Sequence, residues 1–143
     1  MNIVYITEKN GSAIKSQVFE LLNELALNSE VKNIYLLLGT KDINESVDFK
    51  FNQKIEIHYF KNFGMYPMAD FLNIFELQKV LKRILVNENS IFHVRSEYIS
   101  FLLYKAFISI YKNQKPKLYI DIRGAAKEEI EMSQLGKMRK LIK

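Results

Sequence analysis

Three short polar segments follow apolar, strand-like runs, and they hold the residues of this 143-residue chain best suited to chemistry. These residues are Asn10, Gly11, Ser12, Arg95, Ser96, Asp121, Arg123 and Gly124. A glycine lets the backbone approach a ligand closely, and an arginine can hold a phosphate or carboxylate through two parallel hydrogen bonds. The three segments therefore predict an anion-binding site, although a single glycine such as Gly11 is also ordinary in a turn.

Arg95 directly follows the buried run at 90–94 and precedes Ser96, which can cap a helix. This position favours ligand binding by the guanidinium group. The structural alternative is an ion pair between Arg95 and either Glu97 or Asp121. His93 lies within the strand-like run itself, so we interpret it as a histidine of the core rather than a catalytic one.

The segment Asp121-Ile122-Arg123-Gly124 is the most unusual of the three. We expect it at the mouth of a central strand, where burying charged groups is costly and is easier to explain at a functional site. A salt-bridged loop is the alternative. Glu128 and Glu129 follow one turn later, and we interpret them as charges at the start of a helix.

Several other chemistries lack support in the sequence. There is no G-x-G-x-x-G, no phosphate-binding G-x-x-x-x-G-K-[ST] and no G-x-S-x-G. With no cysteine and 2 isolated histidines, no zinc site and no other metal site is expected. The net charge of +5 comes mainly from Lys137, Arg139, Lys140 and Lys143, so nucleic acid is not an expected partner.

The elements that would position these residues alternate along the chain. Continuous apolar runs predict strands at 3–6, 34–38, 90–94 and 118–120, and the alternating run at 55–59 predicts a strand near a sheet edge. Helical spacing of apolar residues predicts helices over 14–25, 74–85 and 99–110, and a further helix is expected after Gly124. The order predicts a doubly wound α/β domain with a mostly parallel sheet and helices on both faces.

Local signals set the expected boundaries of these elements. Ser12, Asp70 and Ser96 are placed to cap the three helices, and Gly39 should end the second strand. Residues 40–53 and 60–68 are expected to be irregular. The helix over 99–110 is apolar on most sides, which predicts that it is well covered.

One domain, residues 1–143, is expected from the length. No secretory signal is visible, and the longest apolar stretch, 99–111, is too short and too polar to span a bilayer. We therefore expect a soluble cytoplasmic protein. The apolar segment 60–68 and the basic end around Met138 could contact the inner face of the membrane; the alternatives are packing onto the domain and a solvated helix end.

These segments together resemble one known family. Residues 2–6, the turn with Gly11 and the following helix look like the opening of a retaining GT-B glycosyltransferase of family 4. The sequence HVRSE at 93–97 is similar to an H-x-R-S stretch of bacterial members. DIRG at 121–124, followed by two glutamates, is similar to a D-x-R-G…E-E stretch of the same subgroup. The resemblance covers essentially the whole chain, as the amino-terminal Rossmann-like half of such an enzyme.

The resemblance implies transfer of a sugar from a nucleotide-sugar to a polysaccharide, lipopolysaccharide or other glycan or lipid-linked acceptor. This half would bind mainly the acceptor, with Gly11 near the donor phosphates and Arg95, Asp121 and Arg123 lining the cleft. The nucleotide-sugar is a co-substrate, and no cofactor is implied. The carboxy-terminal domain that holds most of the donor would lie beyond residue 143, so the chain alone is expected to be inactive.

The sequence departs from the family pattern at two places. The first turn has one glycine where relatives have two or three, and Arg123-Gly124 stands where many relatives place His-Gly. Two other functions therefore stay open. One is a free-standing flavodoxin-like or receiver-like module that binds a ligand or partner, and the other is an interaction domain that docks a protein through residues 60–68.

Overall fold

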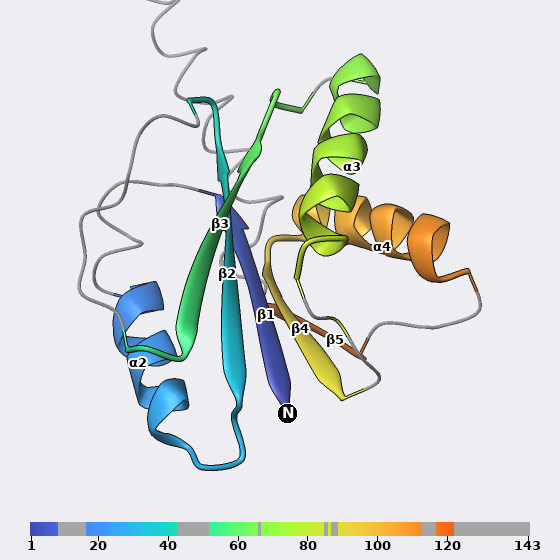
Figure 1. Ribbon diagram of the computed structural model, residues 1–143. Helices are drawn as coiled ribbons and strands as arrows, with labels where there is room; N and C mark the ends of the chain where they lie inside the picture. Colours follow the sequence, from blue (N-terminus) through green and yellow to red (C-terminus); the bar gives the residue numbers. More distant parts are fainter. Residues whose placement is uncertain are drawn as a thin grey trace, which may run out of the picture.

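The computed structural model describes residues 1–8, 17–42, 52–65, 67–84, 86, 89–112 and 117–121. The described strands are β1 (Asn2–Glu8), β2 (Asn33–Thr40), β3 (Ile55–Lys61), β4 (Ser90–Arg95) and β5 (Lys117–Asp121). They form one sheet in the order β3-β2-β1-β4-β5, and every neighbouring pair is parallel (Figure 1). The predicted α/β class and parallel sheet are confirmed.

Helices cover both faces of this sheet. α2 (Phe19–Leu27) lies on one face, while α3 (Pro67–Leu81) and α4 (Glu97–Tyr111) pack together on the other (Figure 1). Side chains alternate between the faces along each strand. Tyr5 of β1 therefore joins the core under α2, whereas Val4 and Ile6 join the core under α3 and α4. The chain is a doubly wound, Rossmann-like α/β domain, as predicted.

β2 runs further than the sequence suggests. Gly39 was expected to end this strand, but it pairs with Phe60 of β3, and β2 continues to Thr40. A Cβ atom at Gly39 would lie 2.7 Å from Cζ of the Phe60 ring. The prediction was wrong because the glycine makes room for a neighbouring aromatic ring, a packing role that the local sequence does not show.

The strands at the two edges of the sheet confirm one predicted strand position and contradict another. β3 lies at one edge, as its alternating sequence predicted. β5 lies at the other edge of the described sheet, so Asp121 ends an edge strand and not the central strand that we expected. Tyr119 and Ile120 of β5 are correspondingly exposed, by 61% and 40%.

α3 begins earlier than expected. We placed Asp70 as its cap and residues 60–68 in an irregular segment, but Phe60 and Lys61 complete β3 and the helix starts at Pro67. Proline suits the first turn of a helix because its missing N–H has no partner there. Asp70 instead lies within the first turn of α3.

α4 begins as predicted, because the Ser96 side chain accepts a hydrogen bond from the backbone N–H of Ile99. The expectation that this helix is well covered on most sides is wrong. Its inward residues, such as Leu102 and Leu103, are fully buried, but Phe101 and Tyr104 are 48% and 43% exposed.

Several sequence predictions lie outside the described residues, namely the cap at Ser12, the helical position of Ile14 and everything from Arg123 to the basic end. Within the described ranges, no helix is long and apolar enough to cross a membrane.

Candidate functional site

Polar residues gather at the carboxyl edge of the sheet. Glu8, Thr40, Arg95 and Asp121 end β1, β2, β4 and β5, and Asn62 directly follows β3. Ligands of such sheets bind beyond the carboxyl ends of the strands, where the strand order reverses. In the order β3-β2-β1-β4-β5 that point lies between β1 and β4. The residues that end these strands, Glu8 and Arg95, are therefore the natural candidates for contact with a ligand.

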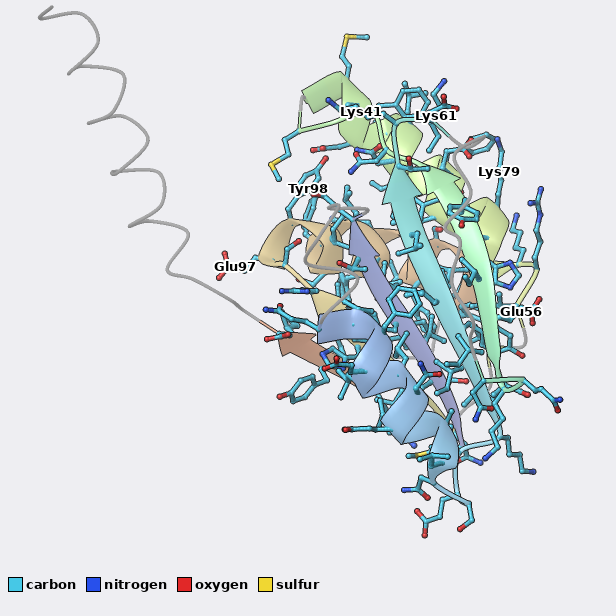
Figure 2. The ribbon with its side chains drawn as sticks, turned by 90° about the vertical axis from the view of Figure 1, so that its left-hand side faces the viewer. Lys41, Glu56, Lys61, Lys79, Glu97 and Tyr98 are labelled. Atoms are coloured by element: carbon cyan, nitrogen blue, oxygen red, sulfur yellow. The ribbon has the colours of Figure 1, made fainter. Side chains whose placement is uncertain are left out.

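Arg95 is held at this edge by a neutral partner. Its Nη2 atom donates a hydrogen bond of 2.7 Å to Oε1 of Gln17, which precedes α2. Because the partner is an amide, this bond orients the guanidinium without neutralising its charge. Figure 2 shows Glu97 projecting outward from the start of α4. This orientation argues against the ion pair between Arg95 and Glu97, whereas the alternative pairing with Asp121, its register partner on β5, stays open.

Ser96 has an unusual backbone conformation next to Arg95. Its φ of 127° and ψ of 150° fall in a region that residues other than glycine rarely adopt. Such a conformation costs about 1–3 kcal/mol, and strain of this kind concentrates at functional sites. The strained residue turns the chain from β4 into α4, so it fixes the direction in which Arg95 and the first turn of α4 face.

Two substitutions at Ser96 should change stability in opposite directions. Ser96→Gly should raise the free energy of unfolding by about 1 kcal/mol, because glycine tolerates this φ and loses only a few tenths as a cap. Ser96→Ala should lower it by about 1 kcal/mol, since alanine keeps the strain and loses the cap. Urea unfolding followed by circular dichroism measures both, and a destabilised Ser96→Gly variant would contradict a strained backbone at this position.

The other predicted site residues divide into two groups. Asp121 is the register partner of Arg95 on the neighbouring strand, so the structure brings these two residues together. Asn10, Gly11, Ser12, Arg123 and Gly124 lie outside the described residues, as do Glu128 and Glu129. His93 is half-buried and packs between the rings of Tyr5 and Tyr119, at centroid distances of 4.5 and 4.8 Å, so it makes packing contacts but does not belong to either buried core cluster.

The carboxyl edge also holds a polar network that the sequence did not predict. Asn62 donates from Nδ2 to Oε1 of Glu8 at 2.8 Å, and its own Oδ1 accepts from the N–H of Gly64 at 2.9 Å. Asn73 of α3 is fully buried and accepts from the N–H of Phe63 at 2.9 Å. The Asn73 amide also donates to the Gly64 carbonyl, at 3.0 Å. The network ties residues 62–65 to both β1 and α3.

Tyr98 links this network to α4. Its hydroxyl donates to Oδ1 of Asp70 at 2.6 Å and accepts from Nδ2 of Asn73 at 3.0 Å. Burial and the hydrogen bond to Asp70 raise the pKa of Tyr98, so the phenol keeps its proton and remains a donor at neutral pH. The starts of α3 and α4 are thereby joined beside the carboxyl edge. The burial of Asn73 could have been predicted from the sequence, because Asn73 lies four residues from both Ala69 and Leu77, which are on the buried side of α3.

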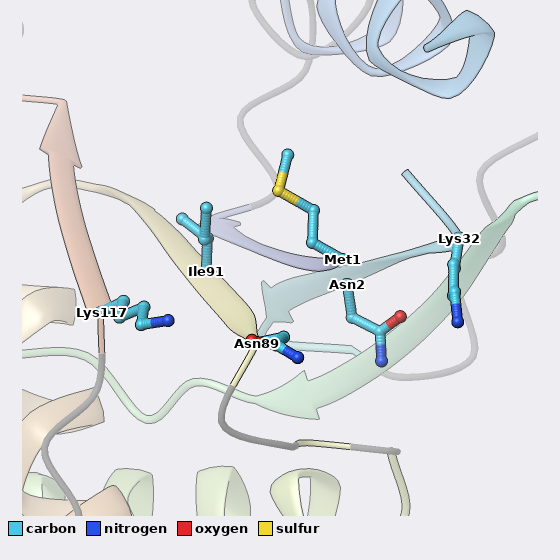
Figure 3. Close-up of a pocket in the computed structure, with 6 residues that line it drawn as sticks. All are labelled: Met1, Asn2, Lys32, Asn89, Ile91 and Lys117. Atoms are coloured by element: carbon cyan, nitrogen blue, oxygen red, sulfur yellow. The ribbon is translucent and has the colours of Figure 1, made fainter. Parts of the chain in front are cut away.

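A cavity of about 300 Å³ opens at the end of the sheet opposite to the carboxyl ends of the strands. It is lined by Met1, Asn2, Lys32, Asn89, Ile91 and Lys117, and Figure 3 shows the two lysines on opposite sides of it. Asn2 and Lys117 are the first residues of β1 and β5. The cavity therefore lies at the amino ends of the strands, away from the edge where parallel sheets bind ligands.

Comparisons with known proteins do not assign this chain to a family. It matches no protein-family model, and no curated protein matches it.

Proposed function

We propose that this chain is the acceptor-side, amino-terminal domain of a retaining glycosyltransferase of the GT-B type. The enzyme would transfer a sugar from a nucleotide-sugar to a glycan or lipid-linked acceptor at the inner face of the membrane. Arg95 and Asp121 would line the cleft between this domain and a second, nucleotide-binding domain, together with Arg123 and the turn at 10–12. The proposal requires no metal.

The observation that carries the proposal is the position of Arg95. It ends the strand next to β1 at the reversal of strand order, and its Nη2 atom bonds the neutral amide of Gln17. The positive end of the α4 dipole begins two residues later, at Glu97. A guanidinium two residues before a helix start, at the carboxyl edge of the sheet, suits the phosphates of a nucleotide-sugar.

The alternative of a flavodoxin-like or receiver-like module fits the structure less well. Those folds have the strand order 2-1-3-4-5, in which the first strand lies beside the second and third. Here β1 lies between β2 and β4, and β3 is at the edge. The strand order is instead that of the first five strands of the dinucleotide-binding fold, 3-2-1-4-5-6, which is the architecture that each domain of the proposed glycosyltransferase requires.

Sugar transfer tests the proposal directly. The chain would be expressed alone and extended by the sequence that follows residue 143 in its gene, and each protein offered labelled nucleotide-sugars with lipid-linked and lipopolysaccharide acceptors. The extended protein should transfer sugar with retention of configuration, and the chain alone should not. A gene that ends at residue 143, or transfer by the chain alone, would overturn the proposed division of labour.

A further inference from the structure

α3 carries a second apolar face that the core does not use. Its inward residues, including Leu77 and Leu81, are fully buried against the sheet and α4. Its outward face presents large apolar side chains with helical spacing, and their exposed fractions are 86%, 83%, 48% and 54% for Met68, Phe71, Leu72 and Phe75. We call these four residues the outer stripe. Exposed apolar side chains gathered on one face mark a surface that contacts something else.

Neighbouring elements extend the apolar character of this region. Met65, two residues before α3, is 66% exposed. α4 packs against α3 on the same face of the sheet and exposes Phe101 and Tyr104. α3, which carries the outer stripe, projects beyond the end of the sheet (Figure 1). An exposed apolar helix face of this kind suits the surface of a bilayer.

Lysines lie over aromatic rings in this region, two of which, Phe75 and Phe101, are exposed. The ammonium groups of Lys61, Lys79 and Lys105 lie 5.1, 4.4 and 5.7 Å from the ring centres of Phe63, Phe75 and Phe101. Lys79 follows Phe75, the last residue of the outer stripe, by four positions, about one helical turn. Rings that enter the apolar layer while adjacent ammonium groups remain among phosphates are typical of elements at a membrane interface.

The charge around the outer stripe is complementary to an anionic surface. In the described parts of 61–84 and 97–112 the cations outnumber the acids, which are Asp70, Glu76 and Glu97. Glu76 and Lys79, 2.6 Å apart, offset each other's charge, so the excess of positive charge comes from the remaining cations, Lys61, Lys82, Arg83, Lys105 and Lys112. Lys41 and Lys61 lie at the same end of the molecule as the start of α3 (Figure 2). Basic residues beside an apolar face draw a helix to anionic lipids.

We propose that the outer stripe of α3 lies in the headgroup region of an anionic bilayer, with Lys61 and Lys79 among the lipid phosphates. The contact is peripheral, because α3 would rest on the surface without crossing it. The proposal does not depend on the glycosyltransferase assignment, since it uses only the exposure and charge of α3 and its neighbours. It would nevertheless bring the carboxyl edge of the sheet close to lipid-linked molecules, because residues 62–65 connect that edge to α3.

Vesicle sedimentation tests this contact with three variants of the 143-residue chain. The wild type should bind vesicles made of equal parts phosphatidylglycerol and phosphatidylcholine, and bind phosphatidylcholine alone much more weakly. Phe71→Ser with Phe75→Ser should weaken binding by at least about tenfold, because two large apolar side chains no longer enter the bilayer. Lys61→Gln with Lys79→Gln should remove most of the preference for the anionic lipid.

Leu27→Ser is the matched control, because Leu27 is 79% exposed on α2 on the other face of the sheet. This variant should bind vesicles like the wild type. Unchanged thermal unfolding in all variants would show that the fold is intact. Equal binding by the Phe71/Phe75 variant, or equal loss in the Leu27 variant, would overturn the proposal. So would a concentration-dependent dimer that disappears in the Phe71/Phe75 variant without any vesicle binding, since a second copy would then occupy the stripe.

Discussion

Replacing Asn73 with alanine is expected to lower the free energy of unfolding by about 3 kcal/mol. The amide is fully buried and makes three hydrogen bonds, with the N–H of Phe63, the carbonyl of Gly64 and the hydroxyl of Tyr98. Alanine removes all three bonds and leaves buried backbone groups with fewer partners. Urea unfolding monitored by circular dichroism gives the difference directly.

Two further variants sharpen this prediction. Asn28→Ala also removes an asparagine that bonds a backbone N–H, that of Glu30 at 2.9 Å, but at an exposed position, so it should cost less than about 1 kcal/mol. Asn73→Asp keeps an acceptor for Phe63 but loses both donors and adds a carboxylate close to Asp70. Its stability should be low at neutral pH and recover partly as acid protonates the new carboxyl group. An Asn73→Ala variant no less stable than Asn28→Ala would show that the network contributes little.

The second large effect concerns ligand binding. Arg95→Ala should weaken the binding of a nucleoside diphosphate by at least about tenfold, because a charge-assisted, two-bond contact with phosphate is lost. Arg95→Lys keeps the positive charge but loses the planar, two-pronged guanidinium group. Its affinity for the nucleoside diphosphate should lie between those of the wild type and of Arg95→Ala. The fold should tolerate both changes, since Arg95 is not part of the buried core and its side chain bonds the amide of Gln17 at the edge of the sheet.

Lys117→Ala is the matched control for Arg95→Ala. It also removes one positive charge, but from the cavity at the amino ends of the strands. Its affinity for the nucleoside diphosphate should equal that of the wild type. Equal weakening by Arg95→Ala and Lys117→Ala would mean that the ligand responds to overall charge and not to a site at the carboxyl edge.

The sequence predicted those features that depend on local pattern. The continuous apolar run at 34–38 became the buried strand β2, and the alternating run at 55–59 became the edge strand β3. Ser96 caps α4 because its side chain and the N–H of Ile99 are close in the chain. Arg95 could be placed at a carboxyl edge because it directly follows a strand.

Features that depend on contacts between distant segments could not be predicted in this way. The ring of Phe60 decides the role of Gly39, although the two residues are 21 positions apart in the sequence. The position of Asp121 depends on strand order, which local pattern does not contain. The outer stripe of α3 was also missed, because apolar residues on two faces of a helix weaken the periodic signal on which the prediction relied.

A titration followed by nuclear magnetic resonance tests the central claim, that the carboxyl edge between β1 and β4 binds the phosphates of a nucleotide. Uridine diphosphate would be added to the isotopically labelled chain and to its Arg95→Ala variant. We expect shifts in the backbone signals of Glu8, Arg95, Ser96 and Asp121 in the wild type, and their loss in the variant. Shifts confined to Met1, Lys32 and Lys117 at the opposite edge, or no shifts at millimolar ligand, would contradict the account.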